Sequence, residues 1–255
     1  MSTCAYCKEE GKPTKEEVMP LFLSRNRPLY RTVLDHDRGI VRRGVVTFVR
    51  DVCEECNGVT LSALDNCAAS LDREYFVNIF DGSRPIEFRY EYDQLLRWLL
   101  KITYNDDRTR SLPFQAERFV PYILGNDPRP LLRTNLLLGL IFPSATTEEQ
   151  RRNGLPEILA PESCGVGFLY VDKPAGPDVA FSRLVQINSY LFEIISWNAN
   201  VARPAARHYL TKICETNSLQ ELKPGNESVI LRKPSIDFLK FQTEYVIRKP
   251  LKDRR

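Results

Sequence analysis

The chain has 255 residues, which corresponds to one large domain or two small ones. Hydrophobic residues make up 43% and charged residues 27%, an ordinary globular composition that excludes a disordered or collagen-like chain. The net charge of +3 is too small to indicate nucleic-acid binding by itself. The longest apolar run, 136–142, is shorter than the ~18 residues of a membrane span, and the first residues lack the pattern of a secretory signal. These features predict a cytoplasmic protein with no membrane partner.

The first 71 residues predict a small unit built around two cysteine pairs. Residues 1–24 are expected to form a cysteine-containing loop followed by a short strand, and residues 25–43 an irregular, arginine-rich segment. The β-branched run 44–52 predicts a strand that leads into the second cysteine pair. Apolar residues then recur at helical spacing up to Leu71, so we expect a helix that starts at or just after Cys56.

Residues 72–255 predict a mixed α+β part. The apolar run around Trp98 predicts a deeply buried helix, and Gly125 is expected to end a second one. Strand patterns then dominate, with a two-residue hairpin turn at Asn188 and Ser189. The expected elements are a strand at 86–90, helices at 91–104 and 115–124, strands at 136–142 and 165–171, a hairpin at 180–197, a helix at 204–215 and strands within 228–247. We therefore expect an α+β protein with a domain boundary after residue 71 and an accessory domain of unknown role at 72–255.

Four of the seven cysteines form two Cys-x-x-Cys pairs: Cys4, Cys7, Cys53 and Cys56. Each pair places two thiolates on one side of a tight turn, and two pairs complete a tetrahedral zinc site. A closed site of this kind is structural, because it leaves no position for water or substrate. The alternatives are two unrelated pairs or one redox pair, which would be expected to open a helix after a strand. The remaining cysteines are expected to be buried apolar residues: Cys67, Cys164 and Cys214.

The order of the elements around these cysteines suggests a particular zinc module. A cysteine loop, a hairpin and a second cysteine pair at a helix N-terminus make a treble-clef, ββα-like arrangement. The metal fixes the helix to the hairpin, which compensates for the small core that ~70 residues can build. The odd number of cysteines argues against a disulfide framework.

Three stretches carry a family resemblance: Cys4-Ala-Tyr-Cys7, Lys15-Glu16-Glu17-Val18-Met19-Pro20 and Cys53-Glu-Glu-Cys56-Asn57. In this order they resemble the HNH endonucleases of the four-cysteine zinc type, in which an acidic-His-aliphatic-x-Pro motif lies between two cysteine pairs. The resemblance covers residues 1–71. It implies a structural zinc, a DNA or RNA partner, and a separate Mg²⁺ or Mn²⁺ ion if the chain hydrolyses phosphodiesters. The helix at 95–101 is similar to one in larger bacterial proteins with such a module, which implies protein partners in a larger complex.

The catalytic position of the motif departs from the family. Glu17 stands where the family has the His that serves as general base, and the loss of such a base costs ~10²–10⁴ in rate. A Glu has an ordinary pKa of ~4.3 and adds negative charge beside the phosphate. A second, metal-binding His is also missing, and Asn57 or Asn66 stands in its place by analogy. Glu17 and Asn57 therefore mark a vestigial or altered catalytic site.

Other polar residues offer alternatives. His36 lies between Asp35 and Asp37, where an aspartate could orient its imidazole, or it is simply solvated. Glu16 and Glu17 could together bind a hard cation, or face water as an exposed pair. His208, on a predicted helix, is expected to be a surface residue.

The arginine-rich segment is the candidate nucleic-acid surface, because arginines contact phosphates as bidentate forks and Tyr30 could stack on a base. The expected contact residues are Arg25, Arg27, Arg31, Arg42 and Arg43. The alternative is a solvated loop whose arginines pair with nearby aspartates. Three functions follow: a zinc protein that binds nucleic acid with a degenerate nuclease site, an active metal-dependent endonuclease with an altered site, or a zinc-stabilised protein-interaction scaffold.

Overall fold

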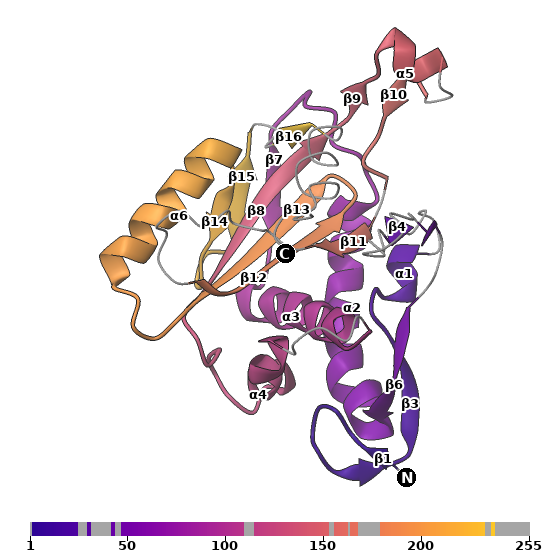
Figure 1. Ribbon diagram of the computed structural model, residues 1–255, viewed down its shortest axis with the longest axis vertical. Helices are drawn as coiled ribbons and strands as arrows, with labels where there is room; N and C mark the ends of the chain where they lie inside the picture. The colour runs from indigo at the N-terminus through magenta and orange to yellow at the C-terminus, as the bar shows by residue number, and fades with distance from the viewer. Residues whose placement is uncertain are drawn as a thin grey trace, which may run out of the picture.

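The computed structural model describes residues 2–24, 30–31, 42–43, 47–109, 115–152, 156–162, 164–167, 179–232 and 236–237. Figure 1 shows a central antiparallel sheet with helix α6 on one side, and a smaller N-terminal unit of hairpin and helices beside it. The molecule mixes helices and strands throughout, which confirms the predicted α+β class.

The N-terminal unit consists of short strand pairs and a broken helix. Strand β3 pairs antiparallel with β6, and β1 pairs with β2 around the first cysteine loop. The helix begins at Cys56 with a π turn, η1, and continues without interruption through α2 into η2. The bounds are β1 Ser2–Thr3, β2 Glu10–Gly11, β3 Pro13–Glu17, α1 Leu21–Ser24, β4 Tyr30–Arg31, β5 Arg42–Arg43, β6 Phe48–Cys53, η1 Cys56–Leu61, α2 Ser62–Leu71 and η2 Asp72–Phe76.

Helix α3 joins the N-terminal unit to the rest of the molecule. It runs over Tyr92–Thr109 and packs against α2 and β6 on one side and against β11 and β12 of the main sheet on the other. Its side chains are buried around almost the whole circumference, as the apolar run predicted. It is preceded by β7 Ile86–Arg89 and followed by η3 Gln115–Phe119 and α4 Val120–Leu124, which ends at Gly125 with a φ of 79°.

The main sheet has the strand order β11-β12-β13-β8-β14, with all of these neighbours antiparallel, and β16 pairs parallel with β8. Its bounds are β8 Thr134–Phe142, β11 Cys164–Gly167, β12 Val179–Ile187, β13 Tyr190–Trp197, β14 Gln220–Leu222 and β16 Ile236–Asp237. Alternate residues of each strand point to opposite faces. Leu136, Leu138 and Phe192 therefore belong to the core that includes α3, whereas Leu137 and Ile195 pack with α6.

The remaining elements lie outside the strand order of the main sheet. Helix α6, Arg203–Asn217, covers one face and begins with Pro204 in its first turn, as predicted. Strand β15, Ser228–Leu231, pairs with β7. A small arm that the sequence analysis missed projects from the body in Figure 1 and comprises β9 Ser144–Ala145, α5 Glu148–Arg152 and β10 Ile158–Leu159.

The hairpin turn predicted at Asn188 and Ser189 is confirmed and is anchored in the core. Asn188 adopts a φ of 49°, a left-handed conformation that asparagine tolerates better than most residues. Its side-chain amide donates to the carbonyl of Phe76 at 2.7 Å, and the hydroxyl of Ser189 accepts from the backbone of Phe80 at 2.8 Å. These bonds attach the turn to the segment that follows α2.

The hydrophobic cluster that includes α3 contains residues from both sides of position 71, from Cys4 in the first loop to Leu231 in β15. The predicted domain boundary after Leu71 falls at the junction of α2 and η2, inside one continuous helix. That boundary stays a prediction.

Candidate metal centre

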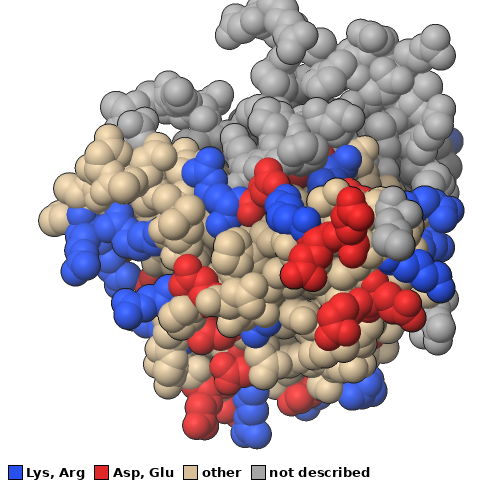
Figure 2. Space-filling view, turned by 90° about the horizontal axis from the view of Figure 1, so that it is seen from below, with Lys and Arg blue, Asp and Glu red and all other residues tan. Residues whose placement is uncertain are grey.

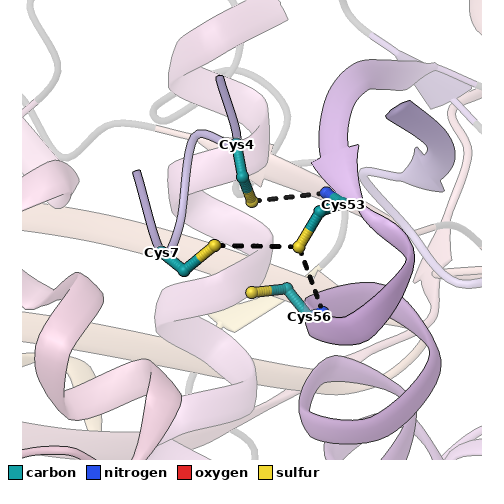
Figure 3. Close-up of side chains that lie close together, drawn as sticks. All are labelled: Cys4, Cys7, Cys53 and Cys56. Atoms are coloured by element: carbon teal, nitrogen blue, oxygen red, sulfur yellow. Dashed lines mark hydrogen bonds between the residues drawn. The ribbon is translucent and has the colours of Figure 1, made fainter. Parts of the chain in front are cut away.

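The four paired cysteines converge on one point. One ligand atom from each of Cys4, Cys7, Cys53 and Cys56 lies within 4.8 Å of every other, although the two pairs are almost fifty positions apart. Figure 3 shows the four side chains directed toward a common centre, with the sulfurs of Cys7 and Cys53 3.7 Å apart. This arrangement could hold a metal ion, and soft thiolates favour zinc over hard cations.

Local backbone geometry positions each sulfur. The first pair lies in the loop between β1 and β2, Cys53 is the last residue of β6, and Cys56 is the first residue of η1. The Cys4 sulfur accepts from the backbone N–H groups of Tyr6 at 3.4 Å and Cys53 at 3.3 Å. A Cβ on Gly11 would lie 3.0 Å from the Cβ of Cys53, so a side chain there would press on the site.

The thiols have opposing electrostatic environments. Burial acts to raise the pKa of Cys4, but the surrounding hydrogen bonds outweigh it and lower that pKa to about 7. Burial raises the pKa of Cys7, and raises the pKa of Cys56 further because neighbouring sulfurs add to it. Four adjacent thiolates repel one another, so full deprotonation requires a cation among them. With four thiols and two of them buried, the site has the closed form of a structural centre.

The first cysteine loop is bound to helix α3. The hydroxyl of Tyr6 donates to Oδ1 of Asn105 at 2.8 Å, and the hydroxyl of Tyr104 donates to the carbonyl of Ala5 at 3.1 Å. Arg108 donates to the same Asn105 oxygen at 3.0 Å and forms an ion pair with Asp51 of β6. The loop that supplies the sulfurs of Cys4 and Cys7 is therefore fixed to α3 by the hydroxyls of Tyr6 and Tyr104.

The two candidate catalytic residues, Asn57 and Glu17, have different partners within the chain. The side-chain amide of Asn57 donates to the hydroxyl of Thr14 at 2.8 Å and to the carbonyl of Lys15 at 3.1 Å, which ties η1 to β3. The carboxylate of Glu17 lies 3.9 Å from the ammonium of Lys15 and its side chain is 22% exposed. Asn66, the other residue that could stand in place of the family's metal-binding His, is exposed on α2.

Glu16 and Glu17 point to opposite faces of β3, because neighbouring strand residues alternate. Glu16 is buried and its carboxylate lies 2.6 Å from the ammonium of Lys101 in α3. The same ammonium lies 2.7 Å from Asp65 of α2, and the other Asp65 oxygen accepts from the indole of Trp98 at 3.1 Å. The two adjacent glutamates therefore do not converge on one cation.

The predicted arginine surface is described only in part. In the backbone register of the β4–β5 ladder Arg31 pairs with Arg42 and Tyr30 with Arg43, while Arg25, Arg27 and His36 lie outside the described residues. His208 is exposed on α6, as expected. Cys164 is buried as predicted, whereas Cys67 and Cys214 are only half-buried.

The structure adds residues that the sequence analysis missed. Lys101 and Asp65 belong to helices that the sequence predicts from apolar positions alone, so the pattern gives no signal for their charged side chains. On the opposite face of β3, Lys15 lies 4.4 Å and Arg50 4.6 Å from the centre of the Phe48 ring. The signal for this second group is alternation within each strand, which relates Lys15 to Glu17 in β3 and Phe48 to Arg50 in β6, although the pairing of the two strands shifts between Thr14 and Glu16.

Comparisons of the chain with protein-family models, with curated proteins and with solved structures find no match. Among the described residues, no helix has both the length and the apolar character needed to cross a membrane.

Proposed function

We propose that this chain is an HNH-endonuclease-like zinc protein that binds nucleic acid and has a degenerate nuclease site. Zinc at the four cysteines would fix β6 and the helix that begins at Cys56 to the first loop, in a treble-clef arrangement. The observation that carries the proposal is the pairing of Glu16, the acidic residue of the motif, with an ammonium of the chain itself, while Glu17 replaces the general base.

The outer face of the β3–β6 hairpin supports the nucleic-acid part of the proposal. Lys15 and Arg50 flank the half-buried ring of Phe48, and the side chain of Lys15 is 47% exposed. Cations bind phosphates, and an aromatic ring offers a stacking surface for a base. The arginines of β4 and β5 follow in the segment that connects the two strands of this hairpin.

Salt-dependent binding tests this proposal. Fluorescence anisotropy with single- and double-stranded DNA and with RNA should show affinity that falls with salt, because each phosphate contact releases counterions. The double variant Lys15→Ala/Arg50→Ala should reduce the slope of log affinity against log salt by roughly 0.7–0.9 per lost contact. The matched control is Lys212→Ala, which removes an exposed lysine from α6. Binding that is absent, or independent of salt, would contradict the proposal.

A cleavage assay with plasmid DNA and RNA in Mg²⁺ or Mn²⁺ tests the degenerate site. The proposal predicts no cleavage by the zinc-loaded chain. Cleavage that is abolished by EDTA and by Glu17→Ala would instead make the chain a metal-dependent endonuclease with an altered site.

A zinc-stabilised protein-interaction scaffold is the second candidate. Figure 2 views the molecule from below, the end at which β1 lies, and shows basic and acidic side chains interspersed over the described part of that face. A surface of mixed charge fits a protein partner better than a phosphate backbone. This candidate predicts metal binding without any affinity for nucleic acid.

A further inference from the structure

Lys101 is a charged residue without exposed side-chain surface. Its ammonium lies 2.6 Å from Glu16 of β3 and 2.7 Å from Asp65 of α2, and its side chain is 0% exposed. A buried ammonium is retained only where paired charges replace its water. The two carboxylates come from different elements, so three segments of the chain meet at this one cation.

The charges at this point do not balance as a simple ion pair would. Two carboxylates carry two negative charges, and the ammonium between them supplies one positive charge. The Glu16 side chain is only 6% exposed, so water does little to screen the repulsion between the carboxylates. Proteins usually hold Mg²⁺ through one or two carboxylates together with waters or substrate phosphates. Here two carboxylates likewise converge on one cation.

The neighbouring contacts fix the geometry of this pair. The indole of Trp98 donates to Oδ1 of Asp65 and thereby directs Oδ2 toward the ammonium. Trp98 and Lys101 are three positions apart on α3, so both project from one side of the helix toward Asp65. The position of the cation is thus set by an outer layer of hydrogen bonding, as in a metal site.

We propose that Glu16 and Asp65 form a two-carboxylate cation site that Lys101 permanently fills, so that the ammonium excludes a hard divalent ion such as Mg²⁺ or Mn²⁺. The inference deepens the proposed function, on which its biological meaning rests, because an occupied site would leave nucleic acid bound but uncleaved. Cation binding is measured without nucleic acid, so each proposal can fail by itself.

The test compares Mn²⁺ binding by zinc-loaded wild-type protein and by Lys101→Ala, using the electron paramagnetic resonance signal of free Mn²⁺. The variant should gain about one bound Mn²⁺ per chain, which the wild type lacks. The double variant Lys101→Ala/Asp65→Asn is the matched control and should lose that ion again. Tb³⁺ excited through the two tryptophans should give sensitised emission in Lys101→Ala, and that emission should be lost in the double variant and in Lys101→Ala/Trp98→Phe, which places the ion beside Trp98.

Each outcome decides the inference. A folded Lys101→Ala that binds no more Mn²⁺ than the double variant would overturn it, as would a Mn²⁺ ion in wild-type protein that is lost on Asp65→Asn. If zinc-loaded Lys101→Ala is unfolded without added Mn²⁺, its circular dichroism should recover when Mn²⁺ is added. Failure of Mn²⁺ to restore the fold would equally overturn the inference.

Discussion

The hydroxyl of Tyr6 donates to Oδ1 of Asn105 at 2.8 Å, across 99 positions of the chain. Tyr6 lies between the two cysteines of the first pair, and Asn105 lies in the last third of α3. The amide of Asn105 also donates to the carbonyl of Glu17 at 3.3 Å. One side chain of α3 therefore contacts both the cysteine loop and the strand that bears the candidate catalytic glutamate.

Removal of the metal should loosen α3 as well as the cysteine loops, because the loop and helix share these hydrogen bonds. Chelation is expected to raise hydrogen exchange in residues 4–7, in η1 and in the part of α3 around Asn105. The hairpin of β12 and β13, on the far side of α3, is the internal control and should keep its protection. Equal loss of protection everywhere, or none in α3, would contradict this coupling.

Tyr6→Phe should destabilise the protein by about 1 kcal/mol, the usual net value of one hydrogen bond. The effect stays small because Asn105 still accepts from Arg108. Urea unfolding of Tyr6→Phe, Asn105→Ala and the double variant would measure it. The cycle should give a coupling energy between the two residues, and strictly additive effects would show that the bond contributes nothing.

Stability should fall as pH rises because of Glu193. This carboxyl is buried in β13, and burial raises its pKa from 4.5 to about 8. The folded state holds the proton of Glu193 more tightly than the unfolded state does. This proton therefore stabilises the fold fully below pH 4.5, and its contribution is lost as pH rises to about 8. Glu193→Gln removes this dependence. The free energy of unfolding of this variant in urea should therefore rise relative to that of wild type between these two pH values and level off above them. Parallel pH curves for the two proteins would contradict the assignment.

Arg183→Leu should destabilise the fold by about 3–5 kcal/mol, because it leaves a buried carboxylate without its cation. Asp107 in α3 is fully buried and lies 2.8 Å from the guanidinium of Arg183 in β12. The double variant Asp107→Leu/Arg183→Leu removes both charges and should recover part of the loss. Thermal unfolding of the three variants compares them, and a double variant as unstable as the sum of the single ones would argue against a charge effect.

Local patterns in the sequence predicted much of the fold. The spacing of the four cysteines predicted their convergence, and the apolar circumference of the segment around Trp98 predicted a buried helix. The hairpin turn at Asn188 and the end of α4 at Gly125 follow from backbone preferences of single residues. These features depend on neighbours in sequence, which a pattern can record.

The features that escaped prediction depend on distant partners. Lys101 interrupts an apolar helix and would normally be placed in water, but its partner Asp65 lies 36 positions away. Glu16 and Glu17 are adjacent in sequence, yet only the pairing of β3 with β6 determines which of them is buried. The catalytic and nucleic-acid roles of Glu17, Asn57 and the arginines stay predictions, since they concern a partner rather than the fold.

The account depends most on a metal at the four cysteines, and elemental analysis of the purified full-length chain tests this directly. We predict about one zinc per chain, lost in the variant Cys53→Ser/Cys56→Ser and retained in Cys214→Ser, whose cysteine lies on α6. A wild-type protein without zinc after purification in zinc-containing buffer, or a double variant that keeps its zinc, would contradict the account.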